Sequence, residues 1–270
     1  SIDYQAFNCD LCLQVGNTPL VRLDRLEWAR RVAPVEVYAK AEWFNPSGSV
    51  KDRAALNIIR AAEADGRLTH DKIILDATSG NMGIAYAMLG AALGFPVTLA
   101  LAANAGPERI AILRAYGAEL LFTDPAQRTD GARRLVHELA AAEPKRYFHA
   151  DQYANPANPL AHYATTGPEL WRQTRGRLTH FVAGMGTSGT MMGVGRYLRE
   201  RNPTVRLVGV QPDRADHGIQ GLKYLAGDDV PAIYNPVGVD AIEEVHTEEA
   251  TAMARALARR EGLFVGISAG

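Results

Sequence analysis

Short runs of β-branched and other apolar residues alternate with longer, helix-like segments along the chain. Each run predicts a strand, and the runs lie at residues 36–40, 72–76, 96–100, 119–122, 179–183 and 205–210. Apolar residues recur at helical spacing between several of them, at residues 54–62, 84–91 and 135–142. Strands that alternate with helices predict parallel strands joined by crossover helices. The predicted fold class is therefore α/β, with doubly wound and mostly parallel sheets.

This alternation breaks near residues 151–159, where Asn and Pro residues cluster. Such residues favour turns, so the break predicts two lobes of unequal size with a cleft between them. Doubly wound sheets bind ligands beyond the carboxyl ends of their strands. We therefore expect the loops that follow strands to carry the chemistry.

The composition is that of an ordinary soluble globular protein. Of the 270 residues, 47% are hydrophobic and 22% are charged, and the formal net charge is −1. This balance indicates no attraction to nucleic acid or to an anionic membrane. No apolar run reaches the roughly 18 residues that a membrane helix needs. The first residues show no export signal, so we expect a cytoplasmic protein.

Two cysteines, Cys9 and Cys12, have C-x-x-C spacing. A structural zinc site usually needs four nitrogen or sulfur ligands, and the sequence has no second such pair to complete one. The pair also does not sit at the strand-to-helix turn of a βαβ unit, where a redox pair is typical. We expect two incidental thiols and no metal.

The first loop with candidate chemistry is N-P-S-G-S-V-K-D-R, residues 45–53, and a helical segment follows it. Its turn-forming residues place Lys51 at the junction of loop and helix. A helix N-terminus disfavours a positive charge, which favours the neutral amine that a Schiff base requires. Taken alone, however, a lysine in such a position is usually a solvated surface charge.

Two further loops follow strands and open helices: T-S-G-N-M-G at residues 78–83 and G-M-G-T-S-G-T at residues 184–190. Backbone N–H groups and hydroxyls at a helix start suit a carboxylate or a phosphate. Routine capping explains the first loop equally well. The second is neither a Walker loop nor a dinucleotide fingerprint. A lysine, a carboxylate loop and a phosphate loop are together what an aldehyde phosphate cofactor for amino acids needs.

At this point the chain resembles a known family. N-T-P-L-V-R-L at residues 17–23, followed in order by N-P-S-G-S-V-K-D-R, T-S-G-N-M-G and G-T-S-G-T, is similar to the signatures of the cysteine synthases. These O-acetylserine sulfhydrylases are fold-type II pyridoxal-phosphate enzymes with a tryptophan synthase β-like fold. The stretch A-H-Y-A-T-T-G-P-E-L-W at residues 161–171 resembles the B-type isozyme. The resemblance covers residues 15–270.

The resemblance implies a role for each matching residue. Lys51 would hold pyridoxal 5'-phosphate as a Schiff base and would move the substrate α-proton. Asn81 would bind the ring oxygen of the cofactor, and Ser268 would face its pyridine nitrogen. The cofactor phosphate would be held by Gly186, Thr187, Ser188, Gly189 and Thr190. The substrate carboxylate would be bound by Thr78, Ser79, Gly80, Met82 and Gln152.

A neutral hydroxyl at the pyridine nitrogen makes a weaker electron sink than a carboxylate would, which favours β-replacement over transamination. The implied reaction makes L-cysteine from O-acetyl-L-serine and sulfide or another sulfur donor, and it releases acetate. Residues 37–150 would form a smaller mobile domain, and residues 1–36 with 151–270 a larger cofactor-binding domain. The resemblance further implies a homodimer and a cleft that accepts the C-terminal tail of serine acetyltransferase.

The sequence departs from the family pattern at several points. Met82 stands where the family usually has threonine, which predicts altered substrate preference more than lost activity. The chain ends at Gly270, where family members continue, so we expect its C-terminal end to be missing. Arg214, with Lys223 nearby, raises the hypothesis that O-phospho-L-serine is accepted. A solvated loop charge is the simpler interpretation of Arg214.

Three alternatives stay open at this level. The chain could be a cystathionine β-synthase-like or serine-dehydratase-like lyase, which shares the same cofactor chemistry. It could instead be a non-catalytic paralogue that binds a partner, although intact Lys51, Asn81, Gln152 and Ser268 argue against this. A nicotinamide dehydrogenase fits the fold class but lacks the fingerprint.

Overall fold

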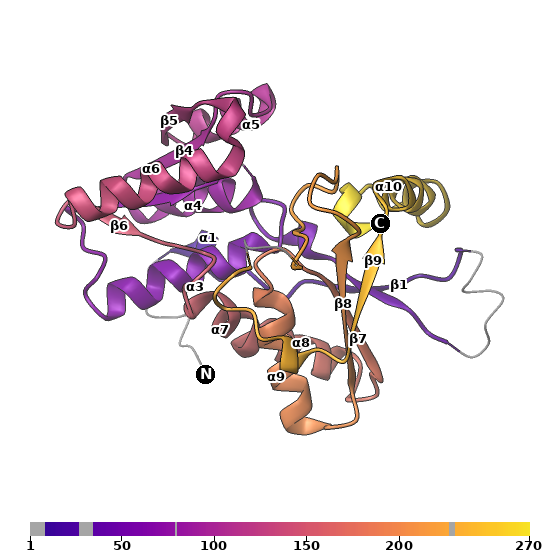
Figure 1. The fold of residues 1–270 in the computed structure, drawn as a ribbon. Helices are drawn as coiled ribbons and strands as arrows, with labels where there is room; N and C mark the ends of the chain where they lie inside the picture. Colours follow the sequence, from indigo (N-terminus) through magenta and orange to yellow (C-terminus); the bar gives the residue numbers. More distant parts are fainter. Residues whose placement is uncertain (1–8, 27–34, 79, 227–229) are drawn as a thin grey trace. The chain divides into compact units, whose positions relative to one another are not determined.

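The computed structural model describes residues 9–26, 35–78, 80–226 and 230–270 (Figure 1). They form two compact units. The first unit comprises Ser1–Gly16 with Trp43–Ala161, and the second comprises Asn17–Glu42 with His162–Gly270. The predicted mobility of one domain stays a prediction.

The first unit is built on a four-stranded parallel sheet. Its strands lie in the order β5-β4-β3-β6, with bounds β3 Ile73–Ala77, β4 Val97–Ala102, β5 Glu119–Thr123 and β6 Tyr147–His149. The apolar runs predicted three of these strands, and β6 was not predicted. Parallel strands place their carboxyl ends at one edge, so the loops after β3 and β6 are neighbours.

Helices cover both faces of this sheet because neighbouring strand residues point to opposite sides. Ile74 packs with α3 (Lys51–Ala64) and α4 (Asn81–Leu93), whereas Leu75 packs with α6 (Arg128–Ala142). Figure 1 shows α6 running alongside the strands and α3 beside α4. The other α-helices described in this unit are α1 Asp10–Leu13, α5 Pro107–Ala115 and α7 Ala157–Ala164, whose last three residues belong to the second unit.

The second unit carries a three-stranded parallel sheet and a separate antiparallel pair. The parallel strands are β7 His180–Gly184, β8 Arg206–Pro212 and β9 Ala241–Val245, in that order. The predicted run at residues 36–40 is a strand, β2 Tyr38–Lys40, but it pairs antiparallel with β1 Leu20–Arg22. Neither β1 nor β9 was predicted from the sequence.

The described part of the second unit also contains the α-helices α8 Thr166–Gln173, α9 Gly189–Arg201 and α10 Thr247–Ala256. Met191, Val194 and Leu198 of α9 pack against Leu207 of β8. A buried ion pair joins Lys40 Nζ of β2 to Glu169 Oε2 of α8 at 2.6 Å. The same carboxylate accepts the Asn17 N–H at 2.9 Å, so it secures the segment before β1 to α8.

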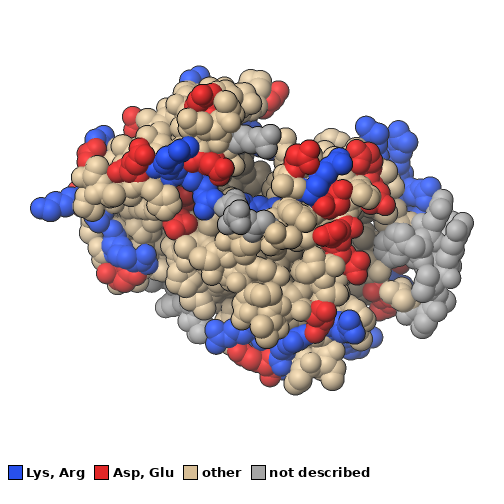
Figure 2. Space-filling model, viewed as in Figure 1, with Lys and Arg blue, Asp and Glu red and all other residues tan. Residues whose placement is uncertain are grey.

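Charged side chains of both signs are interspersed over the visible surface (Figure 2). Among the described residues, no helix has both the length and the apolar character to span a bilayer.

A close approach between α4 and β4 gives the first testable prediction. A Cβ atom on Gly90 would lie 2.3 Å from Val97 Cγ2 and 2.8 Å from the Phe95 carbonyl oxygen. Gly90→Ala is therefore expected to destabilise the fold by about 1–3 kcal/mol, although alanine is the better helix former. Chemical denaturation measures this change. In the control Gly106→Ala, the new Cβ meets only the Glu108 side chain at 3.5 Å, so stability should be nearly unchanged. Equal stabilities of the two variants would contradict the close approach.

Candidate active site

The loop before α3 is fixed at both of its ends. The buried Asn45 side chain accepts the Gly16 N–H at 2.8 Å, and Gly48 turns the chain with a φ of 86°. The buried Asp52 carboxylate accepts the Ser47 N–H at 2.7 Å and also the Ser47 hydroxyl. These bonds define where the following helix begins.

Lys51 is the first residue of α3, so its predicted place at a loop-to-helix junction is confirmed. Its backbone N–H donates to Ser49 Oγ at 3.2 Å, and the residue is half-buried. Further along the same helix, Asn57 Nδ2 donates to the Ala157 carbonyl oxygen at 2.6 Å. The lysine therefore stands on a helix that polar contacts anchor within the first unit.

The loop after β3 leads into α4 without a side-chain cap. Gly80 is the N-cap residue, and its N–H donates to Thr78 Oγ1 at 3.2 Å. Asn81 and Met82 then contribute the first N–H groups of a 13-residue helix. Helix-start N–H groups have no partner within the helix, so this site suits a carboxylate. Ser79, also predicted to bind substrate, lies outside the described residues.

The Met82 side chain does not extend from this loop toward solvent. It is only 2% exposed and belongs to the apolar cluster that α3, α4 and β4 share. Only the backbone of Met82 is therefore left to meet an anion at the start of α4.

Gln152 lies on the neighbouring loop, after β6. The Ala150 N–H donates to the Leu75 carbonyl oxygen at 3.0 Å, which carries the pairing of β3 and β6 beyond the strand end. Asp151 then adopts a left-handed backbone with a φ of 44°. Gln152 is buried, and its carbonyl oxygen accepts Asn158 Nδ2 at 2.8 Å. The structure thus brings Gln152 to the same sheet edge as the 78–82 loop.

The buried carboxyl of Asp76 lies near the end of β3, just before the 78–82 loop. Asp76 is 2% exposed, and its Oδ1 accepts the Ala77 N–H at 2.8 Å. Burial raises the pKa of Asp76 to about 6, and the nearby Asp151 acts in the same direction. The N–H groups of Ala77 and Gln152 and the Tyr86 hydroxyl oppose this rise. Burial, followed by the charge of Asp76, raises the pKa of Tyr86 well above its usual value.

The 186–190 loop of the second unit leads into α9, again without a side-chain cap. Ser188 is 3% exposed and adopts a left-handed backbone with a φ of 69°. Among the described residues its Oγ has no hydrogen-bond partner. A buried, unsatisfied hydroxyl is costly, and an anion at the helix start would satisfy it. The chemistry of Gly186, Thr187, Ser188, Gly189 and Thr190 therefore fits a phosphate group.

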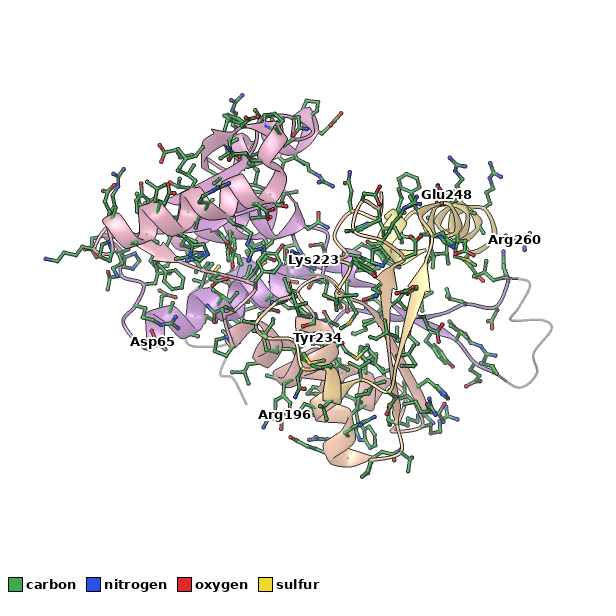
Figure 3. All side chains as sticks on the ribbon, in the orientation of Figure 1. Asp65, Arg196, Lys223, Tyr234, Glu248 and Arg260 are labelled. Carbon is green, nitrogen blue, oxygen red and sulfur yellow. The ribbon has the colours of Figure 1, made fainter. Side chains whose placement is uncertain are left out.

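The segment after β8 packs closely against this loop. A Cβ atom on Gly186 would lie 2.5 Å from the Gly221 carbonyl oxygen, so only glycine fits there. The Lys223 N–H donates to the Met185 carbonyl oxygen at 2.8 Å, and Figure 3 labels Lys223 on this segment. Residues Gly221 and Lys223 thus fix the backbone beside the 186–190 loop.

His162 is a buried residue of this region to which the sequence assigned no function. Its Nε2 lies 3.3 Å from Thr190 Oγ1, and its Nδ1 lies 3.0 Å from Thr166 Oγ1. The imidazole therefore fixes the hydroxyl of Thr190 at the start of α9. No sequence motif signals this role, because it depends on a contact between residues that lie far apart along the chain.

Ser268 and Arg214 are exposed residues of the second unit. Ser268 belongs to a short 3-10 helix, Ile267–Ala269, that packs against α10. Arg214 Nε lies 3.5 Å from Asp216 Oδ1, and the arginine side chain is 55% exposed. Among the described residues, neither side chain forms a hydrogen bond to the 186–190 loop. Their predicted roles stay predictions.

The two cysteines lie together in the first unit. Cys12 Sγ is 2.7 Å from Cys9 Sγ, and burial together with this contact raises the pKa of Cys12 to about 12. Cys12 is therefore a protonated thiol at neutral pH. Within the described ranges, no group of three or more His, Cys, Asp or Glu side chains is placed to hold a metal ion.

Comparison with known proteins identifies the family. A family model described as pyridoxal-phosphate dependent enzyme matches residues 11–270. The chain belongs to this family. Cysteine synthase of Aquifex aeolicus (strain VF5) is 50% identical over 256 residues, which cover 95% of this chain and 78% of that protein. Cysteine synthase B of Salmonella typhimurium is 46% identical over 256 residues, with 95% and 82% covered.

A solved structure agrees with these relatives. The crystal structure of cysteine synthase from Entamoeba histolytica matches with a TM-score of 0.91 and 36% identity, covering 99% of this chain and 81% of that one. The predicted α/β fold, the resemblance to cysteine synthases and the cofactor pyridoxal phosphate are therefore confirmed. The prediction that the chain is a pyridoxal-phosphate dependent enzyme that forms cysteine is also confirmed. The roles of single residues stay predictions.

The burial of Met82 gives a prediction about substrate preference. Met82→Thr removes a core side chain and buries a hydroxyl, so it is expected to lower the free energy of unfolding by about 2–4 kcal/mol. The KM for an amino acid substrate should change by less than about threefold, because the Met82 backbone N–H is retained. Met82→Leu, which conserves volume, is the control and should change neither quantity appreciably. A large change in KM with unchanged stability would place the Met82 side chain in the substrate site instead.

Proposed function

We propose that this protein is a transferase that makes L-cysteine from O-acetyl-L-serine and sulfide, with release of acetate. The observation that carries the proposal is the start of α9, where a buried Ser188 hydroxyl without a partner among the described residues adjoins uncapped helix N–H groups. This is an anion site of the kind that a cofactor phosphate requires. It belongs to a chain whose relatives are named cysteine synthases.

The proposal assigns a binding role to each half of the site. Gly186, Thr187, Ser188, Gly189 and Thr190 would hold the cofactor phosphate, and Asn81 would bind the ring oxygen. The substrate carboxylate would meet Thr78, Ser79, Gly80, the Met82 backbone and Gln152. The uncapped starts of α9 and α4 support these two assignments, because each offers several N–H donors to one anion.

Lys51 would hold the cofactor aldehyde through Nζ and would take up the α-proton of the substrate at the same atom. Bound pyridoxal phosphate supplies the electron sink that makes this proton acidic. The place of Lys51 at the first position of α3 supports the assignment, because a helix N-terminus disfavours the ammonium form. The Asp52 contacts fix the backbone on which the lysine stands.

The overall reaction breaks the bond between the β-carbon and the acetate oxygen and forms a bond between the β-carbon and sulfur. Ser268 would face the pyridine nitrogen with a neutral hydroxyl, which stabilises a positive nitrogen less than a carboxylate would. Loss of the β-substituent is then favoured over transamination. We further propose that residues 37–150 form a smaller, mobile domain.

The location, the oligomeric state and the partners of the protein are also proposals. We expect a cytoplasmic homodimer whose substrates are small molecules, without nucleic-acid or membrane partners. The C-terminal tail of serine acetyltransferase is a proposed partner, because the same carboxylate site would accept a chain terminus. Co-purification of the two enzymes, lost on addition of O-acetyl-L-serine, would support this.

Substitution of Lys51 tests the proposed function. Purified protein is expected to show a visible cofactor band that changes when O-acetyl-L-serine is added, and to form cysteine when sulfide is present. Lys51→Ala should lose this band and reduce turnover by roughly a thousandfold or more, since it removes both the attachment point and the base. Lys145→Ala, which changes an exposed lysine, is the control and should behave as wild type. Pyruvate and ammonia in place of cysteine would favour a dehydratase, and a colourless protein that binds acetyltransferase would favour the non-catalytic alternative.

Substitution of Arg214 tests whether the enzyme accepts O-phospho-L-serine as well as O-acetyl-L-serine. If this guanidinium meets a phosphorylated leaving group, Arg214→Ala should reduce kcat/KM for O-phospho-L-serine by about tenfold and leave O-acetyl-L-serine turnover unchanged. Lys223→Ala provides the comparison at a residue beside the 186–190 loop. Equal losses for both substrates on Arg214→Ala would remove the phosphate hypothesis. Arg214 would then be an exposed residue that pairs with Asp216.

A further inference from the structure

We propose that Cys9 and Cys12 form a reversible dithiol–disulfide site that reacts with small-molecule disulfides. The sequence alone indicates two incidental thiols, whereas the structure places them in contact. The inference goes beyond the proposed function and does not depend on it.

The first support is the distance between the two sulfur atoms. Cys12 Sγ lies 2.7 Å from Cys9 Sγ, and both thiols are free. A disulfide bond is about 2.0 Å long, so a side-chain movement of less than about 1 Å brings the sulfur atoms to bonding distance. The Cys12 N–H donates to the Cys9 carbonyl oxygen at 3.0 Å. A four-residue turn of this kind keeps its end α-carbons within about 7 Å, which is the range that a disulfide needs.

The second support is the orientation of the Cys9 side chain. Cys9 is the N-cap residue of α1, and its Sγ accepts the Cys12 N–H at 3.4 Å. This contact with the backbone is separate from the contact between the two sulfur atoms. Both contacts direct the Cys9 sulfur toward Cys12, so the turn itself presents one thiol to the other.

The third support is that the two thiols differ in access. Cys9 is half-buried, whereas Cys12 is 0% exposed and belongs to the apolar cluster of the first unit. A dissolved disulfide therefore reaches Cys9 before it reaches Cys12. Burial, followed by the contact with Cys9, raises the pKa of Cys12 to about 12, so Cys12 stays protonated and unreactive toward other reagents. Its one accessible reaction partner is the neighbouring sulfur.

The reaction consists of two thiol–disulfide exchanges. The Cys9 thiolate attacks one sulfur of a small-molecule disulfide, which gives a mixed disulfide and releases one thiol. Cys12 then gives up its proton and attacks Cys9 Sγ, so the protein disulfide forms and a second thiol leaves. The protein loses two electrons and two protons, and the small-molecule disulfide gains both.

The disulfide would reinforce a segment that already contacts the loop before α3. The Val15 N–H donates to the Cys12 carbonyl oxygen at 3.3 Å, and the next residue, Gly16, donates its N–H to Asn45 Oδ1 at 2.8 Å. Because the native turn holds the sulfur atoms together, the disulfide should form more readily in the folded chain than in the unfolded chain. It should then stabilise the folded chain by the same factor.

Equilibration of the holoenzyme with reduced and oxidised glutathione tests the proposal. Wild type should lose both thiols, lose two hydrogen atoms in intact mass and retain no glutathione, and a phosphine should reverse the change. The ratio of disulfide to dithiol should be at least roughly tenfold higher in the folded chain than in guanidinium chloride at the same glutathione ratio. The disulfide form should accordingly have a Tm that is higher by roughly 2–5 °C.

Cys12→Ala and Cys9→Ala are matched variants, because the chain has no third cysteine. Cys12→Ala should stop at the mixed disulfide, so its mass should rise by one glutathionyl group. Folded Cys9→Ala should react at least roughly tenfold more slowly than wild type, because its remaining thiol is buried.

Three outcomes would overturn the proposal. They are a mixed disulfide that persists in wild type, an equal preference for the disulfide in the folded and unfolded chains, and a Cys9→Ala variant that reacts as fast as wild type. If Cys12→Ala does not fold, the comparison of folded with unfolded wild type still decides. Cysteine formation is not a readout in this experiment, so failure of the proposed function would leave its result intact.

Discussion

The helices α4 and α9 each begin shortly after a parallel strand and without a side-chain cap. The first N–H groups of a helix have no partner within it, so each start attracts an anion with both hydrogen bonds and a partial positive charge. In the first unit α4 follows β3 in this way, and in the second unit α9 follows β7. An amino acid and its cofactor together carry a carboxylate and a phosphate. The N–H groups at the starts of α4 and α9 are donors of the kind that these two anions need, which supports the proposed assignment.

Buried polar side chains give these starts their fixed geometry. Asp52 holds the loop before α3, Asp76 lies beneath the loop before α4, and Asn158 holds the carbonyl oxygen of Gln152. His162 contacts the hydroxyl of Thr190 at the start of α9. Each of these groups is removed from water and contributes through hydrogen bonds to loops rather than through apolar packing. Burial of these polar groups fixes the loops but costs stability, and the raised pKa of Asp76 shows this cost most clearly.

Sequence patterns predicted what depends on local periodicity and order. Apolar runs located β3, β4 and β5, and loop composition placed Lys51 at a helix start. The patterns missed β6, which is three residues long, and β9, whose Glu243 and Glu244 are exposed. They also gave no sign that residues 36–40 would pair antiparallel with β1. The sequence places Asp76 at the end of a strand, and its burial becomes visible only when distant segments pack together.

Backbone strain adds a further link between fold and site. Among the described residues only four other than glycine have a positive φ, and two of them, Asp151 and Ser188, border the proposed binding segments. Glycine would adopt this conformation at lower cost, so a side chain retained there has a reason beyond the turn itself. At Ser188 that reason is a buried hydroxyl that has no hydrogen-bond partner among the described residues and that a phosphate group would satisfy. The negative charge of Asp151 helps to raise the pKa of the buried Asp76 carboxyl. The chain therefore concentrates strain and unfavourable charge at the two segments where ligand binding would offset them.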